Sequence, residues 1–454
     1  MTIEDRAQIK QQFTRYVIPS VASLWVYTIY TMVDGMFVAK GVGSNALAAV
    51  NLVMPLINIA FSMGVLLAVG ASTRASIYKG QGDFEKANKI FTLGAVTVAC
   101  LGILMFCIVR FNSATIVELL GATNSTKAYV EEYLTKITTF FPFYMSSYYL
   151  EVLVKADGYP QKAIVTTCVG ASTNIILDYV FVIVLEIGVA GAAVATGLSQ
   201  MITFSIFVHH YLSPKSTFKF VRIKIKVAEI LKTARLGISD SITEVSVAVV
   251  TFVFNNVLIA VSGDAGVVIY TILCYVYQIV LMTVMGVNQG MQPLVSFYYG
   301  KREPDSYKYV FKMALTCAGV ASAISFAIGV LYPNPIVAMF IDGVEEPDLF
   351  AHAIAAFRLF SIGFLPVGMV IILAGYFTAL ERPKFAMIVS MCRGLIFVLI
   401  TLAVLTTVLG ENGVWITMGV SETLALGLAL VIYVRKVKPH EYDLLENNSD
   451  SRNY

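Results

Sequence analysis

The 454-residue sequence is poor in charged residues and in the side chains that most often bind metals. Charged residues make up 13% of it and four residues are His, whereas 57% are hydrophobic and the mean hydropathy is +0.77. In a soluble protein of this length about twice that share of the residues is charged, so the composition excludes an ordinary soluble protein. The six Cys and four His show no metal-ligand spacing and no C-x-x-C pair. We therefore expect no metal site, and cysteines that serve packing.

Sequence motifs of nucleotide-driven proteins and enzymes are also missing. No G-x-x-x-x-G-K-[ST] phosphate-binding loop occurs, and no loop is long enough to hold a nucleotide-binding domain. No nucleophile stands in a pattern with a general base, so the sequence predicts no catalytic residue, no enzyme activity and no cofactor. The charged start runs directly into an apolar stretch without a small-residue cleavage pattern, and we expect no cleavable signal peptide.

Long apolar runs dominate the chain. A helix that crosses a bilayer needs about 20 apolar residues, and runs of that length recur twelve times in the sequence. The fold class predicted is therefore an all-α polytopic membrane protein with twelve transmembrane helices. The runs lie near 13–39, 46–77, 90–111, 133–155, 161–185, 188–212, 230–262, 266–298, 308–332, 350–379, 384–408 and 412–434.

The basic residues indicate how the chain is oriented. Of the 32 Lys and Arg, 25 lie in alternate loops and in both tails, and such an excess is typical of the cytoplasmic side. Both termini are therefore expected in the cytoplasm, with the protein in the cell (plasma) membrane. These basic patches face anionic inner-leaflet lipid, and we interpret them as topology signals rather than as a nucleic-acid site.

The two halves of the chain are drifted copies of one unit. When residues 221–440 are shifted back by 220 to 224 positions, Pro366 meets Pro142, Pro383 meets Pro160 and Gly413 meets Gly191. Such a duplication is typical of transporters, because two lobes can rock about a site held between them. The predicted domains are an N-terminal lobe (1–212), a cytoplasmic linker (213–229), a C-terminal lobe (230–434) and a cytoplasmic tail (435–454).

Four polar residues inside the first lobe share one depth in the membrane. At 1.5 Å per residue, Asp34, Asp178 and Thr196 lie about 9 to 12 Å from the outer ends of three different spans, and Asn174 stands one turn from Asp178. Carboxylate, amide and hydroxyl oxygens suit a small cation such as Na⁺, and two neighbouring carboxylates equally suit a shared proton. The alternative is that Asn174 and Thr196 bond to neighbouring backbone while each Asp is paired separately.

A second polar set lies toward the cytoplasm. Tyr144 and Tyr148 stand on the same helical face as Glu151, and aromatic rings beside a carboxylate suit an organic cation. The alternative is that Glu151 pairs with Lys155, one turn away. The sequence leaves both interpretations open.

These features together resemble a multidrug and toxic compound extrusion (MATE) transporter of the bacterial drug-export branch. The resemblance is carried by the six-plus-six repeat, by Pro19 and Asp34 in span one, by the loop 157–160 (Asp-Gly-Tyr-Pro) and by Asn174-Ile-Ile-Leu-Asp178 in span five. It implies a V-shaped pair of lobes that exports amphipathic, often cationic compounds in exchange for Na⁺ or H⁺. It also implies that Pro19 lets span one bend.

The resemblance assigns roles residue by residue. The cation site would comprise Asp34, Asn174, Asp178 and Thr196. Two departures stand out: Tyr179 replaces a frequent proline, and residues 365–369 offer no acid for a second-lobe cation site. The expected partners are small amphipathic cations and membrane lipid, and the expected state is a monomer. The expected substrate contacts are Glu151, Tyr144, Tyr148, Gln200 and Glu244.

Two other functions remain as alternatives. A lipid-linked precursor flippase of the same superfamily would need a cationic cavity, and a passive channel would need a polar stripe repeated through symmetric subunits.

The two repeats differ at the predicted cation site, where Asn255, Phe397, Thr401 and Met418 stand opposite its four members. The sequence therefore predicts coupling in the first lobe alone.

Overall fold

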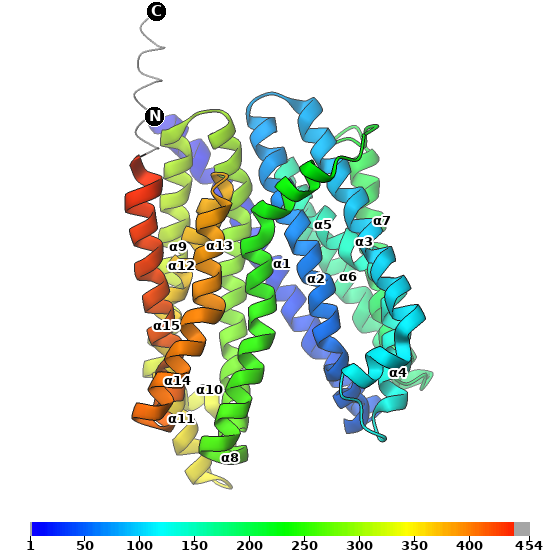
Figure 1. Cartoon of the computed structure of the whole chain (residues 1–454), viewed down its shortest axis with the longest axis vertical. Helices are drawn as coiled ribbons and strands as arrows, with labels where there is room; N and C mark the ends of the chain where they lie inside the picture. The colour runs from blue at the N-terminus through cyan, green and yellow to red at the C-terminus, as the bar shows by residue number, and fades with distance from the viewer. Residues whose placement is uncertain (1, 440–454) are drawn as a thin grey trace, which may run out of the picture. The chain divides into compact units, whose positions relative to one another are not determined.

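The computed structural model describes residues 2–439, apart from the side chain of Ser44, and this part of the chain is helical without a strand (Figure 1). The predicted tail therefore lies largely outside the described residues. The helices of the first repeat are α1 (Ile3–Gly41), α2 (Ser44–Gly80), α3 (Phe84–Leu119), α4 (Lys127–Thr138), α5 (Phe141–Asp157), α6 (Pro160–Asp178), the π-helical η1 (Tyr179–Val184) and α7 (Val189–Leu212). Those of the second are α8 (Val227–Gly300), α9 (Pro304–Leu331), α10 (Pro333–Val337), α11 (Pro347–Ser361), α12 (Phe364–Ala379), α13 (Pro383–Met391), η2 (Cys392–Ile396), α14 (Phe397–Leu409), α15 (Glu411–Ile432) and η3 (Tyr433–Val437).

The predicted twelve spans are present in this part of the chain. Ten helical stretches are long and apolar enough to cross a membrane. One of them, the 74-residue α8, holds two spans because Gly263 adopts a left-handed backbone (φ 63°) in its middle. The 17-residue α5 is a further, shorter span that packs against α2, α3 and α7. The all-α polytopic fold is therefore confirmed.

The chain packs into two compact units, and the boundaries of these units differ from the boundaries of the two repeats. The first unit comprises Ile18–Ser241, and the second comprises the residues up to Val17 together with those from Ile242 onward. Both α1 and α8 therefore begin in one unit and continue in the other. In the repeat, where Arg235 stands opposite Arg15, the two changes of unit fall within about one helical turn of each other, and Pro19 lies next to the first. The predicted domain bounds follow the repeat and stay a prediction.

Within the first unit, α2 crosses the start of α8 with backbone against backbone. A Cβ atom added to Gly70 would stand 1.9 Å from the carbonyl oxygen of Thr233, and one added to Gly237 would stand 1.9 Å from that of Leu66. Small residues of this kind let membrane helices approach closely. Beside the crossing, the guanidinium of Arg74 donates to the Glu229 carboxylate at 2.5 Å.

The non-helical segment 213–226 is anchored to the same unit through Asp157. The backbone N–H of Thr217 donates to one Asp157 oxygen at 2.8 Å, and the His210 ring lies 2.8 Å from the other. Gly158, left-handed at φ 108°, caps α5 directly after this residue. The predicted linker is therefore bonded to the first unit along its first residues.

We expect Gly70→Ala to destabilise the first unit by about 1–3 kcal/mol, because the new methyl group overlaps the Thr233 carbonyl and the crossing must open. Thermal melting of the purified protein measures the effect. Gly319→Ala in α9 is the matched control, since a Cβ there has no neighbour within 4 Å. An unchanged melting temperature for Gly70→Ala would contradict the close crossing.

Candidate functional site

Two carboxyl groups meet in the interior of the first unit. Asp34 comes from α1 and Asp178 from the last residue of α6, and their carboxyl groups lie close enough to interact electrostatically. Asn174, one turn before Asp178, donates to the Thr196 hydroxyl of α7 at 3.3 Å. The structure therefore brings together all four residues of the predicted cation site.

The oxygens of this cluster are buried without donors. Asp178 and Asn174 are completely buried, and four side-chain oxygens have no hydrogen-bond partner among the described residues: Oδ1 of Asp34, Oδ1 of Asn174 and both Oδ atoms of Asp178. A buried acceptor without a donor costs about 1–3 kcal/mol, and more when it is charged. A proton or a small cation bound by these oxygens would remove that cost.

The backbone after Asp178 is unusual and belongs to the site. The α-helix ends at this residue, and η1 continues the same span as a π-helix. π-Helical turns insert an extra residue and often occur at functional sites. The insertion lies at the end of α6 that carries Asp178.

An aromatic cluster adjoins the carboxyl pair. The ring of Phe61 lies 4.6 Å from that of Tyr148 and 6.1 Å from that of Tyr144, and the hydroxyls of Tyr144 and Tyr27 are 3.4 Å apart. Tyr30 packs edge-on against Tyr27 at 5.2 Å. We call these five residues, which come from α1, α2 and α5, the aromatic cluster.

Tyr30 connects the aromatic cluster to the acids. It is 7% exposed and lies close enough to interact electrostatically with Asp34, Asp178 and Glu151. The buried Tyr133 of α4 also lies near Asp34 and Asp178. Two buried tyrosines, Tyr30 and Tyr133, therefore lie near both carboxyl groups.

The predicted substrate residues of the first unit also gather here. Glu151 pairs with the buried Lys155 at 3.1 Å, which is the arrangement that the sequence left as the alternative. Gln200 of α7 accepts a hydrogen bond from Ser147 at 2.5 Å. Contact of these residues with substrate stays a prediction. Glu244, the fifth expected contact, lies in α8 and belongs to the second unit.

Sequence reasoning missed part of this site. Tyr27 and Tyr30 stand two turns and one turn before Asp34 on α1, so their spacing could have indicated a shared face. Phe61 and Tyr133 carry no such signal, because α2 and α4 contain no other residue of the predicted site. Pro19 is buried within α1, which runs through it as one helix.

The second unit holds a closed ion pair. The Nε of Arg393 donates to both oxygens of Glu422 at 2.9 and 3.0 Å, and Nη2 donates to the Tyr277 hydroxyl at 3.3 Å. The side chains of Arg393 and Glu422 are 8% and 2% exposed. They line a cavity of about 100 Å³ together with Gln278 and Thr243.

The first repeat has no ion pair at the positions equivalent to Arg393 and Glu422. Glu422 stands opposite Gln200, and Arg393, within η2, stands opposite Gly170, against which the Thr203 hydroxyl packs in the first unit. A π-helical segment therefore lies in the same span of both repeats. It follows Asp178 in one and contains Arg393 in the other.

We expect Glu422→Gln to destabilise the protein by about 3–5 kcal/mol, because it leaves the Arg393 guanidinium buried without its carboxylate. The double variant Arg393→Met/Glu422→Leu should recover most of that loss, since it removes both charges. Thermal melting of the purified proteins measures both effects. If the double variant melted as low as Glu422→Gln, the loss would not come from an uncompensated charge.

Sequence comparison identifies relatives over nearly the whole chain. The family profile described as MatE matches residues 19–180 and again 241–403. The multidrug export protein MepA of Staphylococcus aureus (strain bovine RF122 / ET3-1) is 23% identical over 443 residues, 95% of either chain. MepA of Staphylococcus haemolyticus (strain JCSC1435) is 22% identical over 430 residues, 94% of either chain.

Solved structures share the fold. A crystal structure of MATE in complex with MaL6 superposes with a TM-score of 0.89 at 20% identity and covers 96% of this chain and 97% of that one. MATE in the bent conformation gives 0.87 at 20% identity over 98% of both chains, and MATE in the straight conformation gives 0.86 at 22% over 96% and 97%. The family profile starts at residues 19 and 241, next to the two changes of packing unit. With more than half of its residues matched, the chain belongs to the MatE family.

Proposed function

We propose that the protein is a secondary active antiporter that exports amphipathic, cationic drugs or toxic compounds in exchange for Na⁺ or H⁺. Its relatives carry the name multidrug export protein, which supports export of varied compounds. The observation that carries the coupling is the set of four buried oxygens without donors at Asp34, Asn174 and Asp178. The cell membrane, with both termini in the cytoplasm, is the proposed location, and a monomer is the proposed state.

The coupling step is the neutralisation of the carboxyl pair. Two carboxylates side by side in a medium of low dielectric repel each other, and binding of one proton or one cation removes that repulsion. The half-buried Asp34 gives the ion access, whereas Asp178 is completely buried. One elementary charge that crosses a potential of 100 mV contributes about 2.3 kcal/mol, which shifts an equilibrium roughly 50-fold.

The aromatic cluster is the proposed substrate surface. Its rings come from three helices, and Tyr30 lies near both the coupling carboxylates and Glu151. A cation over these rings gains about 0.5–2 kcal/mol from the ring quadrupoles. Because Tyr30 belongs to this cluster and lies near the coupling acids, a change at the acids alters the surface that holds the substrate. Glu151, Gln200 and Glu244 remain proposed contacts.

The charge distribution favours this function over a lipid-linked precursor flippase. A flippase of that kind needs cations free to bind pyrophosphate. Arg74 is paired with Glu229, and Arg393 with Glu422. Tyr30 of the aromatic cluster lies instead near three acids, Asp34, Asp178 and Glu151.

The proposal includes a bend of α1 at Pro19. Proline removes one backbone hydrogen bond from α1 and so weakens the helix locally. Related MATE structures are described as bent and as straight. We propose that α1 changes between two such forms when the Asp34 carboxyl is neutralised.

We expect Asp34→Asn and Asp178→Asn each to abolish gradient-driven export of a cationic dye, because either change removes one charge of the coupling pair. Inside-out vesicles with an imposed Na⁺ gradient or an imposed H⁺ gradient, tested separately, measure the effect and identify the ion. The matched control is Glu186→Gln, an exposed acid two turns beyond Asp178. Export at the wild-type rate by both Asp variants at equal expression would refute the coupling site.

We expect Tyr148→Leu to raise the KM for a cationic dye about 2- to 30-fold, in line with a lost cation–π contact. The KM for a neutral compound of similar size should change far less. Transport rates in the same vesicles give both values, and Tyr332→Leu, an exposed tyrosine in the second unit, is the control. Equal changes for the charged and the neutral compound would exclude a cation–π role.

A further inference from the structure

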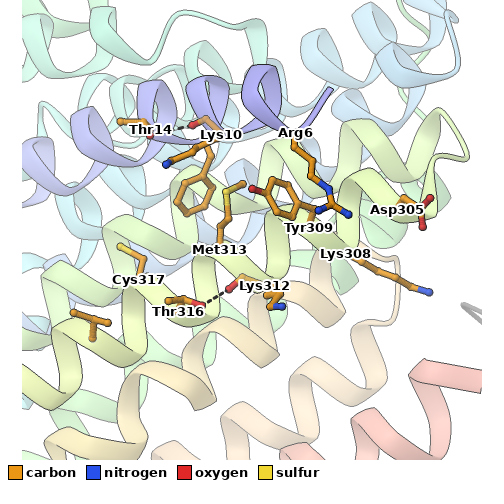
Figure 2. Close-up of a pocket in the computed structure, with 12 residues that line it drawn as sticks. Arg6, Lys10, Thr14, Asp305, Lys308, Tyr309, Lys312, Met313, Thr316 and Cys317 are labelled. Atoms are coloured by element: carbon orange, nitrogen blue, oxygen red, sulfur yellow. Dashed lines mark hydrogen bonds between the residues drawn. The ribbon is translucent and has the colours of Figure 1, made fainter. Parts of the chain in front are cut away.

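A basic groove runs along the second unit between α1 and α9. It has a volume of about 790 Å³ and is lined by the start of α1 and by the first half of α9. Four of its lining residues are basic, and Asp305 is acidic. Figure 2 shows Arg6 extending from α1 toward α9, where its guanidinium lies 6.0 Å from the centre of the Tyr309 ring.

The groove changes from charged to apolar along both helices. On α1, Arg6 and Lys10 are followed one turn later by Phe13 and Thr14. On α9, Lys308 and Lys312 are followed by Met313, Thr316, Cys317 and Val320. From Lys312 to Val320 the helix rises about 12 Å. The charged end is the predicted cytoplasmic end of both helices.

The two threonine hydroxyls that line the groove donate their protons within their own helices, so the deeper part of the groove is apolar in character. Thr14 donates to the carbonyl of Lys10 at 3.0 Å, and Thr316 donates to the carbonyl of Lys312 at 2.9 Å (Figure 2). Both hydroxyl protons are thus used within their own helices. Val320, at the deep end, is 52% exposed.

The equivalent helix start in the other repeat lacks this basic set. α3 and α9 begin at Phe84 and Pro304, so Asn88 and Thr92 stand opposite Lys308 and Lys312. The basic residues of that helix start, Lys86 and Lys89, stand opposite Ser306 and Tyr309. The basic wall on α9 is therefore not repeated on α3, and the duplication alone does not account for it.

We propose that this groove binds an anionic phospholipid of the cytoplasmic leaflet. The phosphate lies among Arg6, Lys10, Lys308 and Lys312, and one acyl chain follows the apolar floor toward Val320. Charge complementarity selects an anionic headgroup, because a basic side chain near such a membrane surface contributes about 1 kcal/mol. The gradient from basic to apolar matches a molecule with a charged head and a hydrocarbon tail. A soluble phosphate or an acidic peptide would use the charged end and leave the floor uncovered.

The bound lipid would hold the start of α1 against α9. The residues that contact it belong to one packing unit, and the contact ends just before the position at which α1 passes into the other. The proposal does not depend on which ion drives transport or on which compound is exported.

The experiment measures binding of phosphatidylglycerol and phosphatidylcholine to the purified full-length protein by native mass spectrometry. The α9 wall is changed by Lys308→Gln/Lys312→Gln and the α1 wall by Arg6→Gln/Lys10→Gln. Each pair should weaken phosphatidylglycerol binding about 30-fold, the effect of two surface charges, and leave phosphatidylcholine binding unchanged. Lys86→Gln/Lys89→Gln is the matched control and should bind as wild type does.

Thermal melting tests whether each variant is folded. If the Lys308→Gln/Lys312→Gln pair does not fold, the single variant Lys312→Gln takes its place, with an expected loss of phosphatidylglycerol affinity of about 5-fold. Wild-type phosphatidylglycerol affinity in folded groove variants would overturn the proposal. An equal loss in the Lys86/Lys89 control would overturn it too, because the effect would then be general surface charge. Displacement of the lipid by millimolar inorganic phosphate would show an anion site without a lipid floor, and would also overturn it.

Discussion

Charge inside hydrocarbon must be neutralised, and this constraint organises the whole chain. Two of its arginines are neutralised by ion pairs within the chain, Arg74 with Glu229 and Arg393 with Glu422. Asp34 and Asp178 are arranged in the opposite way, because like charges are placed together and their buried oxygens have no donor among the described residues. A proton or cation from outside the chain would neutralise this cluster, and that step is the coupling proposed above.

The duplication makes the contrast between the two units informative. Both repeats place a π-helical segment in the same span, and the packing units change within about one turn of equivalent residues in α1 and α8. The backbone plan is thus shared, while the charged groups differ. In the first unit the π-helical segment follows an acid that faces another acid, and in the second it contains a base that faces an acid. One scaffold therefore carries a pair of acids in one unit and a closed ion pair in the other.

Much of the fold and part of the site could be predicted from the sequence. Hydropathy sets the number of spans, and the fixed rise of a helix sets the depth of a residue, which placed Asp34, Asn174, Asp178 and Thr196 at one level. Depth does not give the rotation of a helix about its axis. In membrane helices that rotation is set by packing, because lipid and protein faces are equally apolar and no hydrophobic stripe marks the interior. For this reason the pairing of Arg393 with Glu422, and the place of Phe61 beside Tyr148, could not be foreseen.

α1 is the element through which these features act on one another. Its start packs in the second unit beside the basic groove, and its end carries Asp34 in the first, about 42 Å away along the helix. A rigid helix of that length transmits a displacement of one end to the other. A helix with two forms responds instead by a change in the populations of those forms. Pro19 lies between the two ends, at the change of unit, and lacks the backbone donor that would stiffen the helix there. Under the proposed antiport, an ion at Asp34 would influence the second unit to the extent that it favoured one form of α1 over the other. Contacts at the start of the helix, which hold one of its ends, would then set how much of that preference reached the second unit.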